Sequence, residues 1–166
     1  MTRAAELFSE WFDSLSAGDS FATRGRTITE ADVVSFAALT GDWHPQHSDA
    51  EWSAQSAFGE RIAHGMLVLS FAVGLVPLDP DRIVALRRVG DAVFKQPVRF
   101  GDTIHVEGKV ATLATVDDGV GLVGCTWRVL NQQGKLVARV GIEVLWRREN
   151  TGGGDRRTAR EAVAPL

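Results

Sequence analysis

The second half of the chain alternates between apolar and polar residues, which is the pattern of half-buried β-strands. In residues 103–116, for example, Ile104, Val106 and Val110 are apolar and their immediate neighbours are mostly polar. Turn-forming residues separate the alternating segments, as hairpin connections do. The pattern predicts four strands joined by hairpins, at residues 83–100, 103–116, 121–130 and 136–147.

The first half predicts one more strand and several helices. Residues 20–28 have the composition of a strand. Residues 29–41 begin with a threonine suited to an N-cap, carry carboxylates in their first turn and end at a glycine, so we expect a helix there. A shorter helix is expected at about 50–57. The polar, proline-containing segment 42–49 between them is predicted to be a loop.

Residues 64–76 are apolar on nearly every face of a helix, so this helix is expected to be buried on all sides. A curved antiparallel sheet closing round the helix would bury it, which predicts a single α+β domain. A sheet of about five strands leaves an edge exposed, and pairing two such sheets edge to edge would cover it. We therefore expect a homodimer or a higher homo-oligomer.

The ends of the chain are expected to lie outside this framework. Residues 1–19 have apolar residues at helical spacing but could equally form an extended arm anchored by Trp11 and Phe12. Residues 149–166 contain three consecutive glycines and few apolar residues, which indicates a flexible tail. The domain is thus expected to cover residues 1–148, with 1–19 as its N-terminal arm.

Composition narrows the functional classes. The chain of 166 residues is 45% apolar and 23% charged, with a net charge of −3, and it shows no basic stripe of the kind that binds nucleic acid. The one cysteine, Cys125, is predicted to be a buried core thiol. Neither an apolar signal core nor a membrane-length apolar run is present, so we expect a cytoplasmic protein with no membrane partner.

Acid–base chemistry is concentrated in one loop. Asp42 precedes His47 by five residues across a segment stiffened by Pro45, so both side chains could act on one substrate. The apolar helix that begins at His64-Gly65 offers free backbone N–H groups, which could stabilise a developing enolate oxygen. Gly65 has no side chain, so a thioester carbonyl could approach it closely.

These residues carry a resemblance to a known family. The chain resembles the MaoC-like dehydratases, relatives of the (R)-specific enoyl-CoA hydratases, over roughly residues 8–147. The motifs that carry it are Arg26-Thr27-Ile28-Thr29-Glu30-Ala31-Asp32, Gly41-Asp42 with Pro45, His47 and Asp49, Phe58-Gly59, Ile62-Ala63-His64-Gly65-Met66-Leu67, Phe94-Lys95-Gln96-Pro97-Val98 and Gly101-Asp102. The resemblance implies a hot-dog fold, in which a curved antiparallel sheet wraps a central apolar helix.

The resemblance also implies an activity, the reversible hydration of a trans-2-enoyl-CoA to an (R)-3-hydroxyacyl-CoA. It assigns Asp42 and His47 as the catalytic pair and the Gly65 N–H as the oxyanion donor. The substrate would be an acyl thioester of coenzyme A or of an acyl-carrier protein, with no metal and no redox cofactor. We expect the substrate pocket to include the residues around these three positions, namely Trp43, His44, His64, Met66 and Ser70.

One departure from the family pattern stands inside the catalytic loop. Asparagine is usual where this chain has His44, so the size and polarity of the pocket are open. Two other functions stay open as well: a hot-dog thioesterase, which would release free thiol, and a non-catalytic acyl-CoA-binding subunit. A metal site built from Asp42, His44, His47 and Asp49 is less favoured, because no helix aligns the two histidines. Candidate partners for the CoA phosphates are Arg61, Arg87, Arg88, Lys95 and Arg99.

Overall fold

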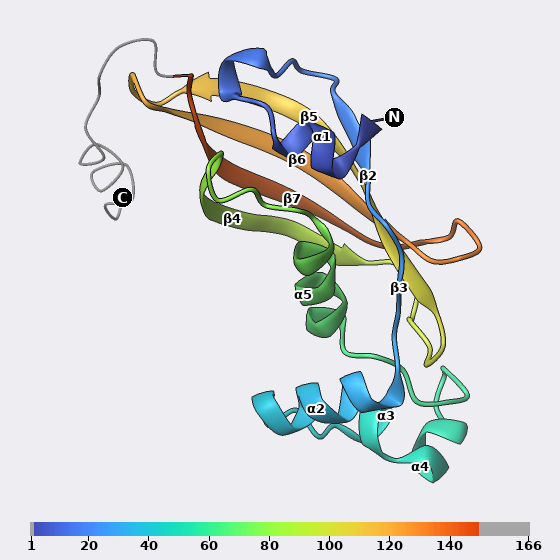
Figure 1. Cartoon of the computed structure of the whole chain (residues 1–166). Helices are drawn as coiled ribbons and strands as arrows, with labels where there is room; N and C mark the ends of the chain where they lie inside the picture. Colours follow the sequence, from blue (N-terminus) through green and yellow to red (C-terminus); the bar gives the residue numbers. More distant parts are fainter. Residues whose placement is uncertain (1, 150–166) are drawn as a thin grey trace.

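A seven-stranded, mainly antiparallel sheet dominates the computed structural model, which describes residues 2–149 (Figure 1). The strand order is β1-β2-β5-β6-β7-β4, and β3 pairs with β5. The strands are β1 (Thr2–Arg3), β2 (Ser20–Ala22), β3 (Arg26–Thr27), β4 (Ile83–Phe94), β5 (Thr103–Thr115), β6 (Val120–Leu130) and β7 (Leu136–Arg147). The four long strands are those that the alternation predicted, except that β4 ends at Phe94 and does not continue to residue 100. The expected strand at 20–28 is divided into two short strands, β2 and β3, both paired with β5.

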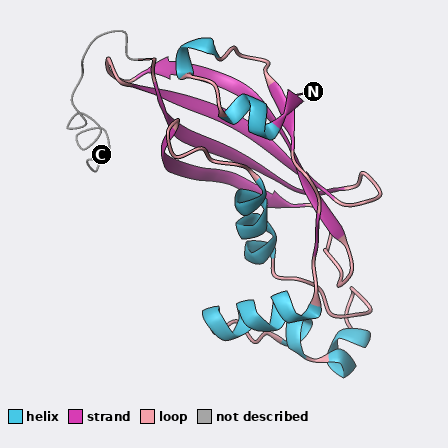
Figure 2. Cartoon of the chain, viewed as in Figure 1, coloured by secondary structure: helices cyan, strands magenta, loops and turns pink. Residues whose placement is uncertain are grey.

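The helices lie against the sheet and at one end of it. They are α1 (Ala4–Phe8), the 3-10 turn η1 (Phe12–Ser14), α2 (Glu30–Thr40), α3 (Pro45–Ser48), α4 (Ala50–Ala54) and α5 (Gly65–Leu75). Figure 2 shows α2, α3 and α4 gathered at one end, with α5 between them and the sheet. The predicted α+β class, with a curved antiparallel sheet around an apolar helix, is confirmed. Within residues 2–149, no helix is long and apolar enough to cross a membrane.

Helix α2 ends where its sequence signals predict. Thr29 and Asp32 form a reciprocal capping box, and Gly41 takes the left-handed conformation with φ 79°. That conformation is unfavourable for residues with a Cβ, so the glycine stops the helix and turns the chain towards Asp42. Val33 and Ala37 of this helix are buried, whereas Leu39 is 83% exposed.

Helix α5 packs on the sheet through one side. Leu67, Val68 and Ala72 are buried in the core. The prediction that this helix is buried on all sides is wrong for the single chain, since Met66 is 60% exposed and Ser70 is also exposed. The sheet covers one face of the helix, and no other described segment covers the face that carries Met66 and Ser70.

The N-terminal arm is neither one helix nor fully extended, but two short helical turns joined by irregular chain. Phe8 and Phe12 are buried and Trp11 is half-buried, and Phe8 packs against Trp146 with ring centroids 5.0 Å apart. A Cβ on Gly121 of β6 would lie 2.2 Å from the ring of Phe12, so this glycine leaves room for the anchor. Apart from Glu149, the expected flexible tail at 149–166 lies outside the described residues.

Candidate active site

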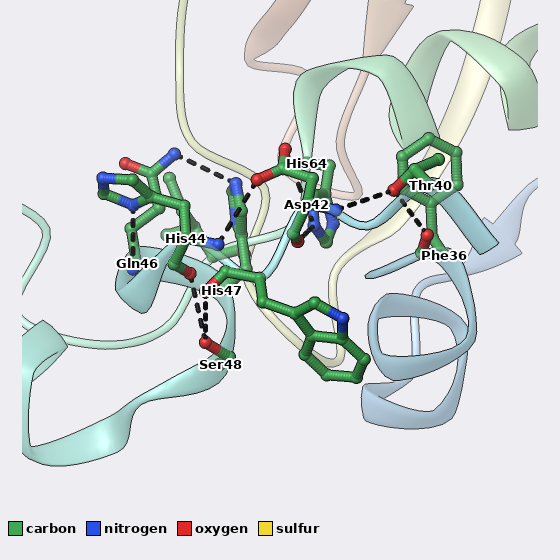
Figure 3. Close-up of polar contacts among 10 residues, drawn as sticks. Phe36, Thr40, Asp42, His44, Gln46, His47, Ser48 and His64 are labelled. Atoms are coloured by element: carbon green, nitrogen blue, oxygen red, sulfur yellow. Dashed lines mark hydrogen bonds and ion pairs between the residues drawn. The ribbon is translucent and has the colours of Figure 1, made fainter. Parts of the chain in front are cut away.

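Asp42 lies in the short connection between α2 and α3 (Figure 3). Its carboxylate Oδ1 accepts a hydrogen bond from the backbone N–H of His44 at 3.3 Å, and its own N–H donates to Thr40 Oγ1 at 3.3 Å. The side chain is 52% exposed, so it faces open space rather than the core. These local bonds hold the loop while leaving the carboxylate able to contact a substrate or a water.

The predicted loop at 42–49 contains a one-turn helix, α3, which begins at Pro45. His44 is its N-cap: the ring Nδ1 accepts a hydrogen bond from the Gln46 N–H at 3.2 Å. The His44 ring also meets the ring of Trp52 edge-on, with centroids 5.5 Å apart. The fixed φ of proline and the capping side chain stabilise a turn that loop composition alone did not reveal.

This turn places His47 with its ring buried, at 4% exposure. The ring Nδ1 is 2.7 Å from the backbone carbonyl oxygen of Ile62. A carbonyl only accepts hydrogen bonds, so Nδ1 carries the proton. In the neutral imidazole, the lone pair is therefore on Nε2, the nitrogen that can accept a proton from a substrate or a water.

His64 connects the parts of the site. Its Nε2 donates to the backbone carbonyl of Asp42 at 2.9 Å, and its ring stacks on His47 with centroids 3.8 Å apart. It is also the residue that precedes α5. One side chain thus contacts the loop of Asp42, the ring of His47 and the start of the helix that carries Gly65.

A cleft of about 450 Å³ lies at this junction and is lined by Asp42, His47 and Gly65 together. His64 and Met66, two of the expected pocket residues, also line it. The other three expected pocket residues, Trp43, His44 and Ser70, are not among its lining residues.

Each of these three is held elsewhere. Trp43 is 52% exposed. His44 caps α3 and packs on Trp52. Ser70 donates to the Met66 carbonyl at 2.8 Å, on the exposed side of α5.

Sequence reasoning did not assign several residues of the cleft wall to the site, and Gln46 and Phe94 are the two with the closest contacts to predicted site residues. The carboxamide Nε2 of Gln46 is 3.0 Å from His47 Nε2. Three ring atoms of Phe94 lie 2.7, 2.8 and 2.9 Å from the point where a Cβ on Gly65 would be. Phe94 belongs to a motif that carried the resemblance, whereas Gln46 stands between two residues of another motif, Pro45 and His47. The available signal was the position of Gln46 next to His47 and of Phe94 three residues before Pro97.

Burial holds the pKa of His47 below its ordinary value, because the charged imidazolium loses solvation there. The hydrogen bond to the Ile62 carbonyl opposes this effect, and so does the carboxylate of Asp42, while His64 adds to the lowering. The balance favours the neutral imidazole, which is the form that can act as a base.

Comparison with known proteins identifies the family. The family model described as "MaoC like domain" matches residues 14–125, more than half of the chain. The chain belongs to this family. The (R)-specific enoyl-CoA hydratase of Rhodospirillum rubrum is 34% identical over 101 residues, which cover 61% of this chain and 69% of that protein.

Two further relatives define the extent of the similarity. Protein MaoC of Klebsiella aerogenes is 42% identical over 100 residues, covering 60% of this chain but only 30% of that longer protein. A double hot-dog protein of Mycobacterium tuberculosis superposes with a TM-score of 0.76 at 21% identity, over 96% of this chain and 52% of its own. At this identity the likeness supports the fold alone, and the expected hot-dog fold is confirmed.

A metal centre has only partial support from the geometry of this MaoC-like chain. Of the four residues considered as ligands, His44 caps α3 and Asp49 caps α4 by accepting from the Trp52 N–H at 2.9 Å. Asp42, His47 and His64 instead bring their ligand atoms within 4.8 Å of one another. The two imidazole rings are stacked, however, so their in-plane lone pairs do not converge on a common point.

The structure separates the candidate cations for the CoA phosphates. Arg61 pairs with Glu30, Arg99 with Glu60 and Arg88 with Glu143. Lys95 lines the cleft, whereas Arg87 is not among its lining residues. Lys95 is therefore the candidate that stands nearest to the proposed chemistry.

Proposed function

We propose that this chain catalyses the reversible addition of water to a trans-2-enoyl thioester, giving an (R)-3-hydroxyacyl thioester. The observation that carries the proposal is the convergence of Asp42, His47 and Gly65 on one cleft. Membership of the MaoC-like family supports it, as does the hydratase relative at 34% identity. The substrate class would be thioesters of coenzyme A or of an acyl-carrier protein.

The geometry supports a simple proton route. The ligand atoms of Asp42 and His47 lie within 4.8 Å of each other, a separation that one bridging water can span. In hydration, the Asp42 carboxylate would hold the water. The oxygen of the water would bond to Cβ of the substrate, and one proton of the water would move to His47 Nε2. His47 would then deliver this proton to Cα on the same face. The net result is addition of water across the double bond, with the site regenerated.

The start of α5 would stabilise the intermediate charge. As water adds to Cβ, negative charge moves to the thioester oxygen, and N–H groups in the first turn of a helix have no partner within the helix. Gly65 is the first residue of α5 and lines the cleft. Its backbone N–H, with the positive end of the helix dipole behind it, is suited to this oxygen. Neither a metal nor a redox cofactor enters the scheme.

The edge of the sheet supports a homodimer. Strand β4 is at the edge, and it carries the exposed apolar residues Leu86, Val89, Val93 and Phe94. A second copy could pair with it antiparallel, covering the edge by two-fold symmetry. Light scattering should report a dimer or larger, and Val89→Lys should lower the oligomeric state. Val116→Lys, at a 44% exposed valine on the β5–β6 hairpin, is the control.

The direct test follows the loss of enoyl-thioester absorbance with crotonyl-CoA and longer enoyl-CoAs. Asp42→Asn keeps an acceptor for the His44 N–H, and His47→Asn keeps a donor for the Ile62 carbonyl, so both should fold. Each should lower turnover at least about 100-fold, while Asp118→Asn, at an exposed hairpin aspartate, should not. Wild-type rates in both site variants would refute the mechanism, and release of free thiol would identify a thioesterase.

A further inference from the structure

Gln46 holds a fixed position beside the proposed base. Its backbone is held at both ends, because its N–H donates to His44 Nδ1 at 3.2 Å and its carbonyl accepts from the Ile62 N–H at 3.0 Å. Its side chain lines the cleft, and the carboxamide Nε2 is 3.0 Å from His47 Nε2 (Figure 3). The residue therefore reaches the one imidazole nitrogen that the proposed chemistry uses.

The direction of this hydrogen bond follows from the other side of the ring. His47 Nδ1 donates to the Ile62 carbonyl, so Nε2 of the neutral ring has a lone pair and accepts. The carboxamide must then present its NH₂ group, which is the orientation observed. Once His47 has taken a proton, Nε2 becomes a donor. A carboxamide that rotates by half a turn can meet that state with its oxygen.

We propose that Gln46 is a positioning residue for His47, whose carboxamide partners Nε2 in the neutral state and again in the protonated state. The role rests on the proposed hydration, in which His47 passes through both states in each turnover. A water entering the site would share or replace this contact, so the carboxamide also lies where the attacking water must bind. An apolar residue at position 46 could do neither.

The groups that face His47 determine how its pKa should respond to a charge introduced at position 46. Asp42 approaches from the loop, His64 stacks on the ring, and His44 lies with its ring centroid 6.3 Å away. Lys95 lines the same cleft. Among the residues that the structure describes, Gln46 is the only one whose side chain forms a hydrogen bond with the ring, so a charge introduced there should act on His47 directly.

The first experiment is Gln46→Glu, read by NMR titration of the histidine ring protons in the full chain. A carboxylate at this position stabilises the protonated ring, so the pKa of His47 should rise by about one unit or more. The chain has four histidines, and the His47→Asn variant identifies the signal of His47. Gln55→Glu makes the same change at an exposed residue that caps α4, and it should leave the pKa nearly unchanged.

Turnover gives the second readout. In Gln46→Glu, the acidic limb of the kcat/KM profile for hydration should move to higher pH, because the neutral ring is needed to take the proton. Gln46→Leu keeps a similar volume without either hydrogen bond, and it should lower kcat by about tenfold, the rate equivalent of one hydrogen bond. KM should change less than about threefold, because the contact is to His47 and not to the acyl chain.

The two readouts separate the possible failures. An unshifted His47 pKa in Gln46→Glu, equal to that of Gln55→Glu, would overturn the contact itself. A shifted pKa with wild-type kcat in Gln46→Leu would overturn the role in turnover. If the wild-type chain hydrates no enoyl thioester, the proposed function fails, and the NMR titration still decides whether Gln46 holds His47.

Discussion

The close approach of Phe94 to Gly65 makes a sharp prediction. A Cβ on Gly65 would lie 2.7 Å from Phe94 Cζ, so Gly65→Ala forces the ring to move by about 0.8 Å to reach an ordinary carbon–carbon contact of about 3.5 Å. Phe94 is 48% exposed at the end of β4, so its ring can retreat towards solvent. We expect a steric cost at the low end of the about 1–3 kcal/mol typical of overpacking.

Removing the Phe94 ring should reverse the sign of the effect that Gly65→Ala has on the free energy of unfolding. Gly65 is helical and has no positive φ, so alanine is compatible with its backbone and would by itself stabilise the fold by about 0.4–1 kcal/mol. Gly65→Ala should therefore destabilise the wild-type chain by about 1 kcal/mol but stabilise the Phe94→Ala chain by about 0.5 kcal/mol. The coupling energy of the double-mutant cycle, about 1.5 kcal/mol, measures the steric contact between the two residues.

Urea unfolding followed by tryptophan fluorescence, at one protein concentration for all four chains, measures the cycle. The same change in the free energy of unfolding in both backgrounds would refute the steric argument. Enoyl-CoA hydration then isolates the second role of Gly65. If the thioester oxygen binds at its N–H, Gly65→Ala should still reduce activity at least about tenfold in the Phe94→Ala background. Full activity there would show that glycine is needed only to accommodate Phe94.

Three further predictions follow from the loop. Burial lowers the pKa of His47, and the neutral ring is the active form in hydration, so the acidic limb of the kcat/KM profile should have its midpoint below the ordinary histidine pKa of about 6.5. A midpoint above about 7 would show that burial does not dominate the pKa of His47. His44→Asn should keep the α3 cap and leave kcat/KM within about threefold of wild type, whereas His44→Ala should lower the free energy of unfolding in urea by about 1 kcal/mol. An equal loss of unfolding free energy in both variants would mean that the contact of the His44 ring with Trp52 matters more than the cap. Dialysis against EDTA should leave the hydration rate unchanged, and loss of activity restored by Zn²⁺ would instead assign Asp42, His47 and His64 to a metal.

The elements that sequence alone could predict are those whose signals are local. Thr29 and Asp32 form a capping box within one turn, and Gly41 adopts the conformation that stops a helix. The long strands could be predicted because one face of the sheet packs in the core and the other does not, which leaves an alternating apolar and polar pattern in the sequence. In β6, for example, Val123, Cys125 and Trp127 point into the core while the residues between them do not. The proximity of Asp42, His47 and Gly65 came from the family resemblance, since no spacing rule joins a loop to a helix that starts 18 residues after His47.

What the sequence could not decide depended on distant partners. The apolar spacing of residues 1–19 suits a helix or an arm, and the choice depends on where Phe8 and Phe12 pack, against Trp146 and beside Gly121. His44 was expected in the pocket because it replaces a polar family residue. Its ring turns away because the Gln46 N–H needs a cap and Trp52 offers a surface. The exposure of Met66 shows the same limit, because hydrophobicity does not say which surface will cover a side chain.

His64 explains why these separate pieces form one site. Its Nε2 is used on the Asp42 carbonyl, and its Nδ1 is buried with no hydrogen-bond partner among the described residues. An unpaired buried acceptor costs about 1–3 kcal/mol, so an apolar side chain of similar shape would be favoured if packing were the whole role. Phenylalanine could stack on His47 but could not hold the Asp42 carbonyl, and glutamine could hold the carbonyl but could not stack. Imidazole does both at once, which fixes the loop of Asp42 and the ring of His47 relative to the start of α5 and accounts for an unsatisfied buried nitrogen beside the cleft.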